Sequence, residues 1–134
     1  MATLIREIPL TVSAESAWAA VQDVGAVHRR LAPGLVTDVK LQDGVREVTF
    51  ANGLVIQELI VSIDHPLRRL AYTALNRARH HHATMQIFAE SDGRCRFVWI
   101  TDVFPDDVAG RFAAVMDQAM PIIAHTLQSG AAKT

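Results

Sequence analysis

The strongest constraint on the fold is a series of turn signals that divides residues 35–104 into short runs rich in Val, Ile, Thr, Tyr and Phe. Runs of this composition, joined by short turns, are typical of antiparallel strands connected by hairpins. We therefore predict six strands in this stretch, with a further strand at Thr3–Val12, where alternate apolar residues share one face. The turn signals are Asp43-Gly44, Asn52-Gly53, Asp64-His65-Pro66, Asn76 to Arg79, and Asp92-Gly93.

Helical patterns flank the predicted strands. Ser13 is a good N-cap for a helix whose apolar stripe includes Trp18 and Val21, and a short second helix is predicted at Val27–Leu31. A long helix follows Pro105-Asp106-Asp107, and Pro121 inside it predicts a kink. Residues 129–134 are expected to be a frayed end. The apolar stripe of the long helix comprises Val108, Phe112, Val115, Met116, Ala119, Met120, Ile123 and Leu127.

This order of elements predicts a single α+β domain over residues 1–134. One long helix covers a face of a seven-stranded antiparallel sheet only if the sheet curves around it. A curved sheet over one helix leaves a gap between the two layers, and such gaps are common sites for small molecules. The sequence therefore predicts an internal, mostly apolar cavity.

Composition excludes several classes of function. Thirteen basic residues nearly balance fourteen acidic ones, so we expect no nucleic-acid surface. Cys95 is the single cysteine, which fits a reducing compartment. The first residues do not resemble a signal peptide, and no apolar run has the length of a membrane span. We expect a cytoplasmic protein that is a monomer or weak homodimer. We also expect no cofactor, because phosphate loops and nucleotide fingerprints are absent from the sequence.

Several stretches resemble the START/Bet v 1-like (SRPBCC) superfamily, in particular its small bacterial polyketide cyclase/dehydrase-type members. The resemblance implies a helix-grip fold, with the curved sheet wrapped around the long C-terminal helix and two short helices after the first strand. It implies less about chemistry, because lipid carriers, hormone receptors, cyclases and lyases share this scaffold. The matching stretches are Ser13 to Trp18, Gly44 to Val48, Asn52-Gly53 with Glu58-Leu59, Tyr72, and Trp99 to Pro105.

Part of the chain is also similar to the plant abscisic-acid receptors, namely Gly44 to Val48 and Glu58-Leu59. The proline-bearing gate loop of those receptors is absent, since Gly53 and Glu58 are too close together. Their latch is not reproduced by Arg79-His80-His81. We therefore do not expect a hormone receptor.

Glu58 is the most informative residue, because a carboxylate is out of place in the apolar run from Leu54 to Ile63. A two-residue Asn-Gly turn places Arg46 opposite Leu59. A three-residue loop with a bulge places Arg46 opposite Ile60, and Val48 opposite Glu58. The second register, which the resemblance favours, puts Arg46, Val48, Phe50, Ile56, Glu58 and Ile60 on the cavity wall, where Arg46 can pair with Glu58. The alternative is an outward Glu58 in a surface ion pair.

The run His80-His81-His82 has two interpretations. Only His80 and His82 share a strand face, so a zinc site would need further ligands, and we favour a polar cluster without a metal. The resemblance implies that His82, Thr84 and Gln86 face the cavity together with Tyr72. Alternatively, His82 is a partly exposed side chain without a function in binding or catalysis.

The predicted function is the binding or carriage of a small hydrophobic molecule, aromatic or polyketide-like. Phe112, Met116 and Met120 would form the floor of the cavity, while Trp18 and Trp99 are assigned to the core. One alternative is an enzyme of the cyclase, dehydrase or lyase type, with Glu58, Tyr72 and His82 as acid-base candidates. A second alternative is a helper that binds another protein at the cavity mouth.

Overall fold

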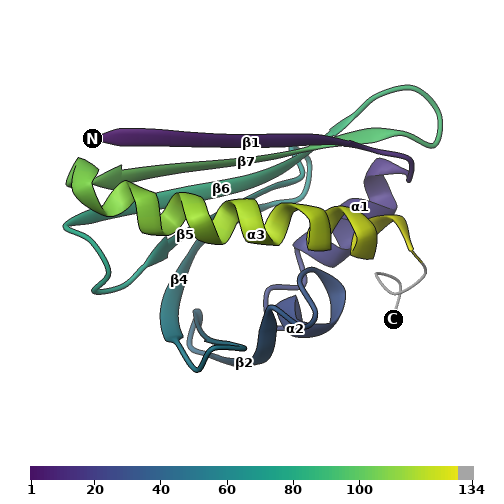
Figure 1. Ribbon diagram of the computed structural model, residues 1–134. Helices are drawn as coiled ribbons and strands as arrows, with labels where there is room; N and C mark the ends of the chain where they lie inside the picture. The colour runs from purple at the N-terminus through teal and green to yellow at the C-terminus, as the bar shows by residue number, and fades with distance from the viewer. Residues whose placement is uncertain (130–134) are drawn as a thin grey trace.

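The computed structural model describes residues 1–129 and contains one seven-stranded antiparallel sheet with the strand order β1-β7-β6-β5-β4-β3-β2 (Figure 1). The predicted curved sheet around a long terminal helix is confirmed. Of the expected frayed end at residues 129–134, residues 130–134 lie outside the described residues. The strands are β1 (Ala2–Leu10), β2 (Val36–Gln42), β3 (Val45–Phe50), β4 (Val55–Asp64), β5 (Arg69–Ala74), β6 (His80–Ala89) and β7 (Cys95–Phe104).

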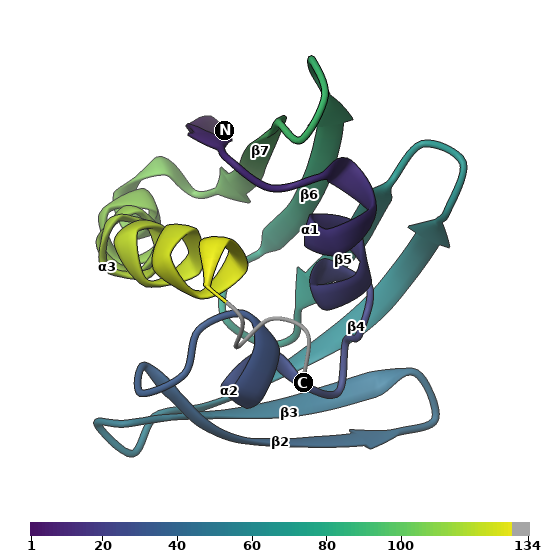
Figure 2. The same ribbon diagram turned by 90° about the vertical axis from the view of Figure 1, so that its right-hand side faces the viewer.

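Helix α1 (Ala14–Val21) begins at the predicted cap, where the Ser13 hydroxyl accepts a hydrogen bond from the backbone N–H of Ser16 at 3.1 Å. Helix α2 (Val27–Arg30) ends one residue earlier than predicted, because Leu31 leaves helical geometry. The two short helices lie near the C-terminal half of the long helix in Figure 1, and Figure 2 shows them inside the curve of the sheet.

The long helix starts with a 3₁₀ turn, η1 (Asp106–Val108), and continues as α3 (Ala109–Gln128). Its buried residues include Met116, Ile123 and Leu127 from the predicted stripe. Pro121 lies inside α3, and the kink there stays a prediction. Helix α3 packs along β1, and the Arg6 side chain of β1 forms an ion pair with Asp117 of α3.

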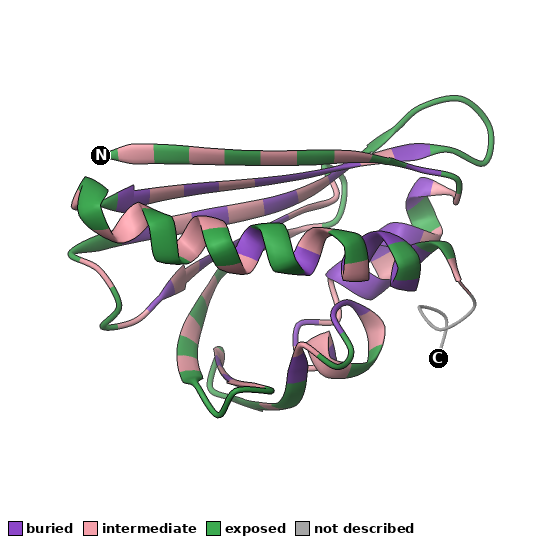
Figure 3. Ribbon diagram, in the orientation of Figure 1, coloured by how far each residue is buried: buried purple, intermediate pink, exposed green. Residues whose placement is uncertain are grey.

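The core lies between α3, α1 and the concave face of the sheet. Along β1, partly buried and exposed residues alternate up to buried Leu10, as Figure 3 shows, so the predicted strand has its apolar parity inward. Phe97, Leu70 and Leu127 are among the largest fully buried side chains. Trp18 and Trp99 are both buried in the core, and Trp99 also lines the cavity described below.

Both registers considered for the β3–β4 hairpin are wrong. Arg46 lies opposite Glu58 and Val48 lies opposite Ile56. The loop has three residues, as in the second register, but they are residues 51–53. Phe50 N–H donates to Leu54 O at 2.8 Å, and Gly53 N–H donates to Phe50 O at 2.9 Å. Gly53 has a φ of +91°, which a glycine adopts without strain and which lets the loop close one residue earlier.

Candidate ligand-binding site

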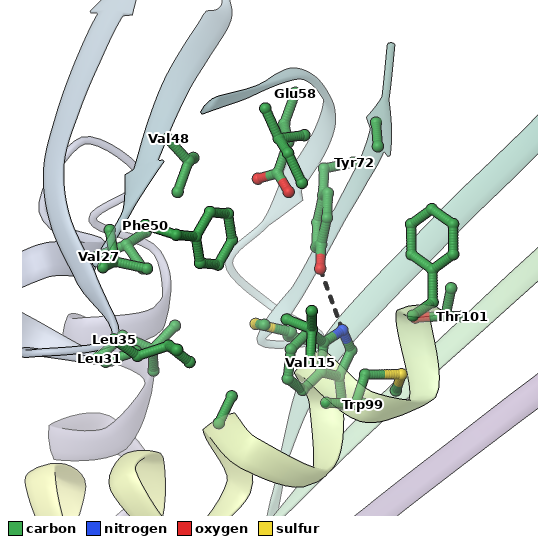
Figure 4. A pocket seen from close by; sticks show the side chains of 18 of the residues that line it. Val27, Leu31, Leu35, Val48, Phe50, Glu58, Tyr72, Trp99, Thr101 and Val115 are labelled. Carbon is green, nitrogen blue, oxygen red and sulfur yellow. Dashed lines mark hydrogen bonds between the residues drawn. The ribbon is translucent and has the colours of Figure 1, made fainter. Parts of the chain in front are cut away.

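A cavity of about 90 Å³ lies between α3 and the concave face of the sheet (Figure 4). Helix α2 and the residues after it close one side. Most of its wall is aliphatic or aromatic, and the polar side chains are few. The lining residues are Val27, Leu31, Ala32, Leu35, Val36, Arg46, Val48, Phe50, Ile56, Glu58, Tyr72, Ala74, His81, Met85, Trp99, Thr101, Phe112, Val115, Met116, Ala119 and Ile123.

The predicted pair of Arg46 and Glu58 is present on this wall. Arg46 Nε donates to Glu58 Oε1 at 2.7 Å, and the two side chains are 4% and 14% exposed. The register places both side chains on the inner face, because Arg46 and Glu58 are direct cross-strand partners. Arg46 also donates to the backbone carbonyl of Val24 at 3.3 Å, so the guanidinium is tied to the loop between α1 and α2.

Tyr72 extends this polar group across the sheet. The Arg46 guanidinium carbon lies 4.8 Å from the centre of the Tyr72 ring, and Trp99 Nε1 donates to the Tyr72 hydroxyl at 3.1 Å (Figure 4). Burial, and then the nearby charge of Glu58, raise the pKa of the Tyr72 hydroxyl above its usual value. The phenol is therefore neutral at physiological pH and retains its proton.

The expected inward placement of His82, Thr84 and Gln86 is wrong. Tyr72 lies opposite Ala83, so the inner face of β6 carries His81, Ala83 and Met85 instead. His82, Thr84 and Gln86 are half-buried on the outer face. The signal for this parity was in the sequence, because the apolar series Ala83, Met85, Ile87 alternates with the polar series.

His81 is the histidine that lines the cavity. Its Nδ1 accepts a hydrogen bond from the backbone N–H of Ala74 at 2.8 Å, and its ring lies 4.9 Å from the ring of Phe112. Burial, with smaller effects of His82 and His80, lowers the pKa of His81 to about 4. Neutral His81 therefore keeps Nδ1 as an acceptor and carries its proton on Nε2.

The other site residues predicted from the sequence divide into two groups. Phe50, Phe112 and Met116 line the cavity together with Val48 and Ile56. Ile60 and Met120 pack against the core as partly buried side chains and are not among the lining residues. Thr101, a buried polar residue of β7, was missed, because a threonine in a strand gives no periodic signal of its own.

A surface groove of about 180 Å³ adjoins the cavity beside the first half of α3. Ile56, Phe112 and Val115 belong to both linings, so these three side chains separate the groove from the interior. Leu54, Arg77 and Arg111 complete the groove.

The three neighbouring histidines of β6 have different surroundings. Within residues 1–129, no three His, Cys, Asp or Glu side chains lie together as a metal would need. His80 and His82 share the outer face, while His81 is on the inner face. The histidine run thus divides between the two faces, as strand geometry requires.

Comparison with known families identifies the chain. A family model described as polyketide cyclase / dehydrase and lipid transport matches residues 1–129. The chain belongs to this family. The family covers both enzymes and lipid carriers by its description, so membership by itself does not decide between catalysis and binding. The comparison with curated proteins gave no match.

Solved structures similar to this family member agree in fold. An uncharacterized protein of Bacillus thuringiensis has a TM-score of 0.84 at 15% identity, covering 96% of this chain and 100% of the other. A Thermobifida fusca protein has a TM-score of 0.78 at 23% identity, covering 99% and 96%. Norcoclaurine synthase of Thalictrum flavum, in complex with dopamine and hydroxybenzaldehyde, has a TM-score of 0.71 at 16% identity, covering 95% and 84%. These likenesses concern the fold.

No helix within residues 1–129 is both long and apolar enough for a bilayer span.

The buried ion pair yields a stability prediction. Arg46→Met leaves the Glu58 carboxylate unpaired on an apolar wall, and we expect the unfolding free energy to fall by about 3–5 kcal/mol. The double variant Arg46→Met/Glu58→Gln should be more stable than Arg46→Met alone. Urea unfolding measures all three proteins. Arg6→Met, which removes the exposed pair with Asp117, is the control and should cost less than about 1 kcal/mol. Equal costs for the two arginine variants would contradict the burial of the pair.

His81 yields a prediction about pH. Because folding lowers the pKa of His81 to about 4 from 6.5, its contribution to stability is complete above pH 6.5 and is lost as pH falls toward 4. His81→Gln keeps an acceptor for the Ala74 N–H but does not titrate, so its unfolding free energy should fall less steeply over this range. His125→Gln, at an exposed position on α3, is the control. Parallel pH profiles for wild type and His81→Gln would refute the burial of a neutral His81.

Proposed function

We propose that this protein binds a small hydrophobic molecule, with an aromatic or polyketide-like body, in the cavity beneath α3. The observation that carries the proposal is the composition of the wall. Aliphatic and aromatic side chains surround the cavity, and a few oriented polar groups interrupt them. This combination is typical of sites that bury most of an apolar ligand and orient it through a few hydrogen bonds.

The size of the cavity limits the ligand. The cavity volume of about 90 Å³ is smaller than the about 150 Å³ of an apolar cavity known to hold benzene. A ring-sized ligand therefore requires side chains to move. Phe112 and Met116 are suited to this, because Phe112 lies between groove and cavity and methionine adapts its shape readily. Longer ligands can extend into the groove.

The polar groups favour binding or carriage over acid-base catalysis. Of the three catalytic candidates, Glu58 and Tyr72 line the cavity and His82 does not. The Glu58 carboxylate is held by Arg46, and burial keeps Tyr72 neutral. The pKa of His81, at about 4, is far from the near-neutral value that suits a general acid or base at physiological pH.

Titration with toluene tests the proposal. We expect saturable binding by isothermal titration calorimetry, with amide shift changes that centre on cavity residues such as Met116 and Thr101. Ala119→Leu fills the cavity from α3 and should weaken binding at least tenfold. Ala114→Leu is the matched control, because Ala114 is exposed on the same helix, and it should leave the affinity unchanged. Circular dichroism verifies that both variants fold. Shift changes spread over the surface, with no saturation, would contradict an internal site.

A further inference from the structure

Three polar side chains of neighbouring strands line one part of the cavity wall. Tyr72 of β5, Ala83 of β6 and Thr101 of β7 are direct neighbours across the sheet. His81 lies on the same inner face of β6, two residues before Ala83. Ala83 itself is fully buried and is not among the lining residues, and the ring centres of Tyr72 and His81 are 6.0 Å apart.

Each of the three polar groups has a hydrogen-bonding atom that is not used within residues 1–129. The Tyr72 hydroxyl accepts from Trp99, which leaves its own proton to donate. His81 accepts at Nδ1, which leaves the Nε2 proton. Thr101 is 2% exposed, and no hydrogen bond of its hydroxyl is found among the described residues. All three residues line the cavity.

A ligand that covers a polar group without giving it a hydrogen-bond partner loses about 1–3 kcal/mol for each such group by mutational measurement. Two of these groups, the Tyr72 phenol and the neutral His81 imidazole, present a proton, and the Thr101 hydroxyl either donates or accepts. An oxygen acceptor in the cavity, within reach of these side chains, would satisfy this set. A purely hydrocarbon ligand would leave the set unsatisfied.

Charge on the wall restricts the ligand further. Arg46 and Glu58 are the charged side chains among the lining residues, and they form one ion pair with no net charge. A ligand carboxylate placed here would lie near Glu58, and a ligand ammonium would lie near Arg46. Either charge would lose its hydration without a free partner of opposite sign. The inner end of the ligand is therefore neutral.

We infer that the cavity selects a neutral ligand whose carbonyl oxygen accepts hydrogen bonds from Tyr72, His81 and Thr101. The inference rests on the proposed function, because it names the chemical class of the molecule bound in the same cavity. The Arg46 guanidinium packs against the Tyr72 ring and helps to position it. The ion pair of Arg46 with Glu58 excludes charged ligands.

A pair of probes with the same shape tests the inference. Acetophenone carries a carbonyl where α-methylstyrene carries a methylene group. We expect acetophenone to bind about 5- to 10-fold more tightly in calorimetric titrations, the equivalent of about one net hydrogen bond. Benzoate, which replaces the ketone with a carboxylate, should bind more weakly than both. Equal affinities for acetophenone and α-methylstyrene would overturn the inference while leaving the proposed function intact. Binding of neither probe would overturn both.

Variants assign the preference to this wall. Thr101→Val keeps the shape of the side chain and removes the hydroxyl, so it should reduce the preference for acetophenone at least twofold without weakening α-methylstyrene. Tyr72→Phe, verified by circular dichroism, should do the same. Thr84→Val is the matched control, because Thr84 lies on the outer face of β6. An unchanged preference in both Thr101→Val and Tyr72→Phe would show that the oxygen is bound elsewhere.

Discussion

The fit of α3 against the concave face of the sheet is the constraint on which the rest of this structure depends. At its two ends the curved sheet packs against different helices, β1 against α3 and β2 against α2, and the residues between these ends do not fill the space between the layers. Alanines contribute to the gap from both sides, with Ala74 on β5 and Ala119 on α3. The hollow is thus a consequence of side-chain size as much as of backbone shape.

A second consequence concerns the polar residues that strand alternation turns inward. Arg46, Glu58 and Tyr72 are inside because their parity matches that of the apolar residues around them. Once inside, each must be paired. Arg46 pairs with Glu58, and the Tyr72 hydroxyl accepts from Trp99. The Tyr72 hydroxyl keeps its own proton, which no hydrogen bond among the described residues uses.

Parity explains how much of the site could be predicted from the sequence. The predicted face of β3 and β4 is right although the predicted register is wrong. The observed pairing of Arg46 with Glu58 differs from the favoured one by two residues, and a shift of two leaves every side chain on the same face. On β6 the expected parity was wrong, so His81 lines the cavity and His82 lies on the outer face. The alternation of Ala83, Met85 and Ile87 with polar residues was the better guide there.

Other features depend on contacts that no local pattern contains. Thr101 lines the cavity because β7 lies between β1 and β6, which is a long-range pairing. The volume of the hollow depends on how α3 packs along its length. The tautomer of His81 depends on a single backbone N–H from the neighbouring strand.

Xenon binding to crystals under pressure tests the central claim most directly, since xenon enters preformed apolar cavities and needs no specific contacts. This account predicts one strong xenon site between Val48, Phe50 and Met116, inside the curved sheet. Density for close-packed side chains at that place, with xenon absent or bound only at the surface, would contradict it.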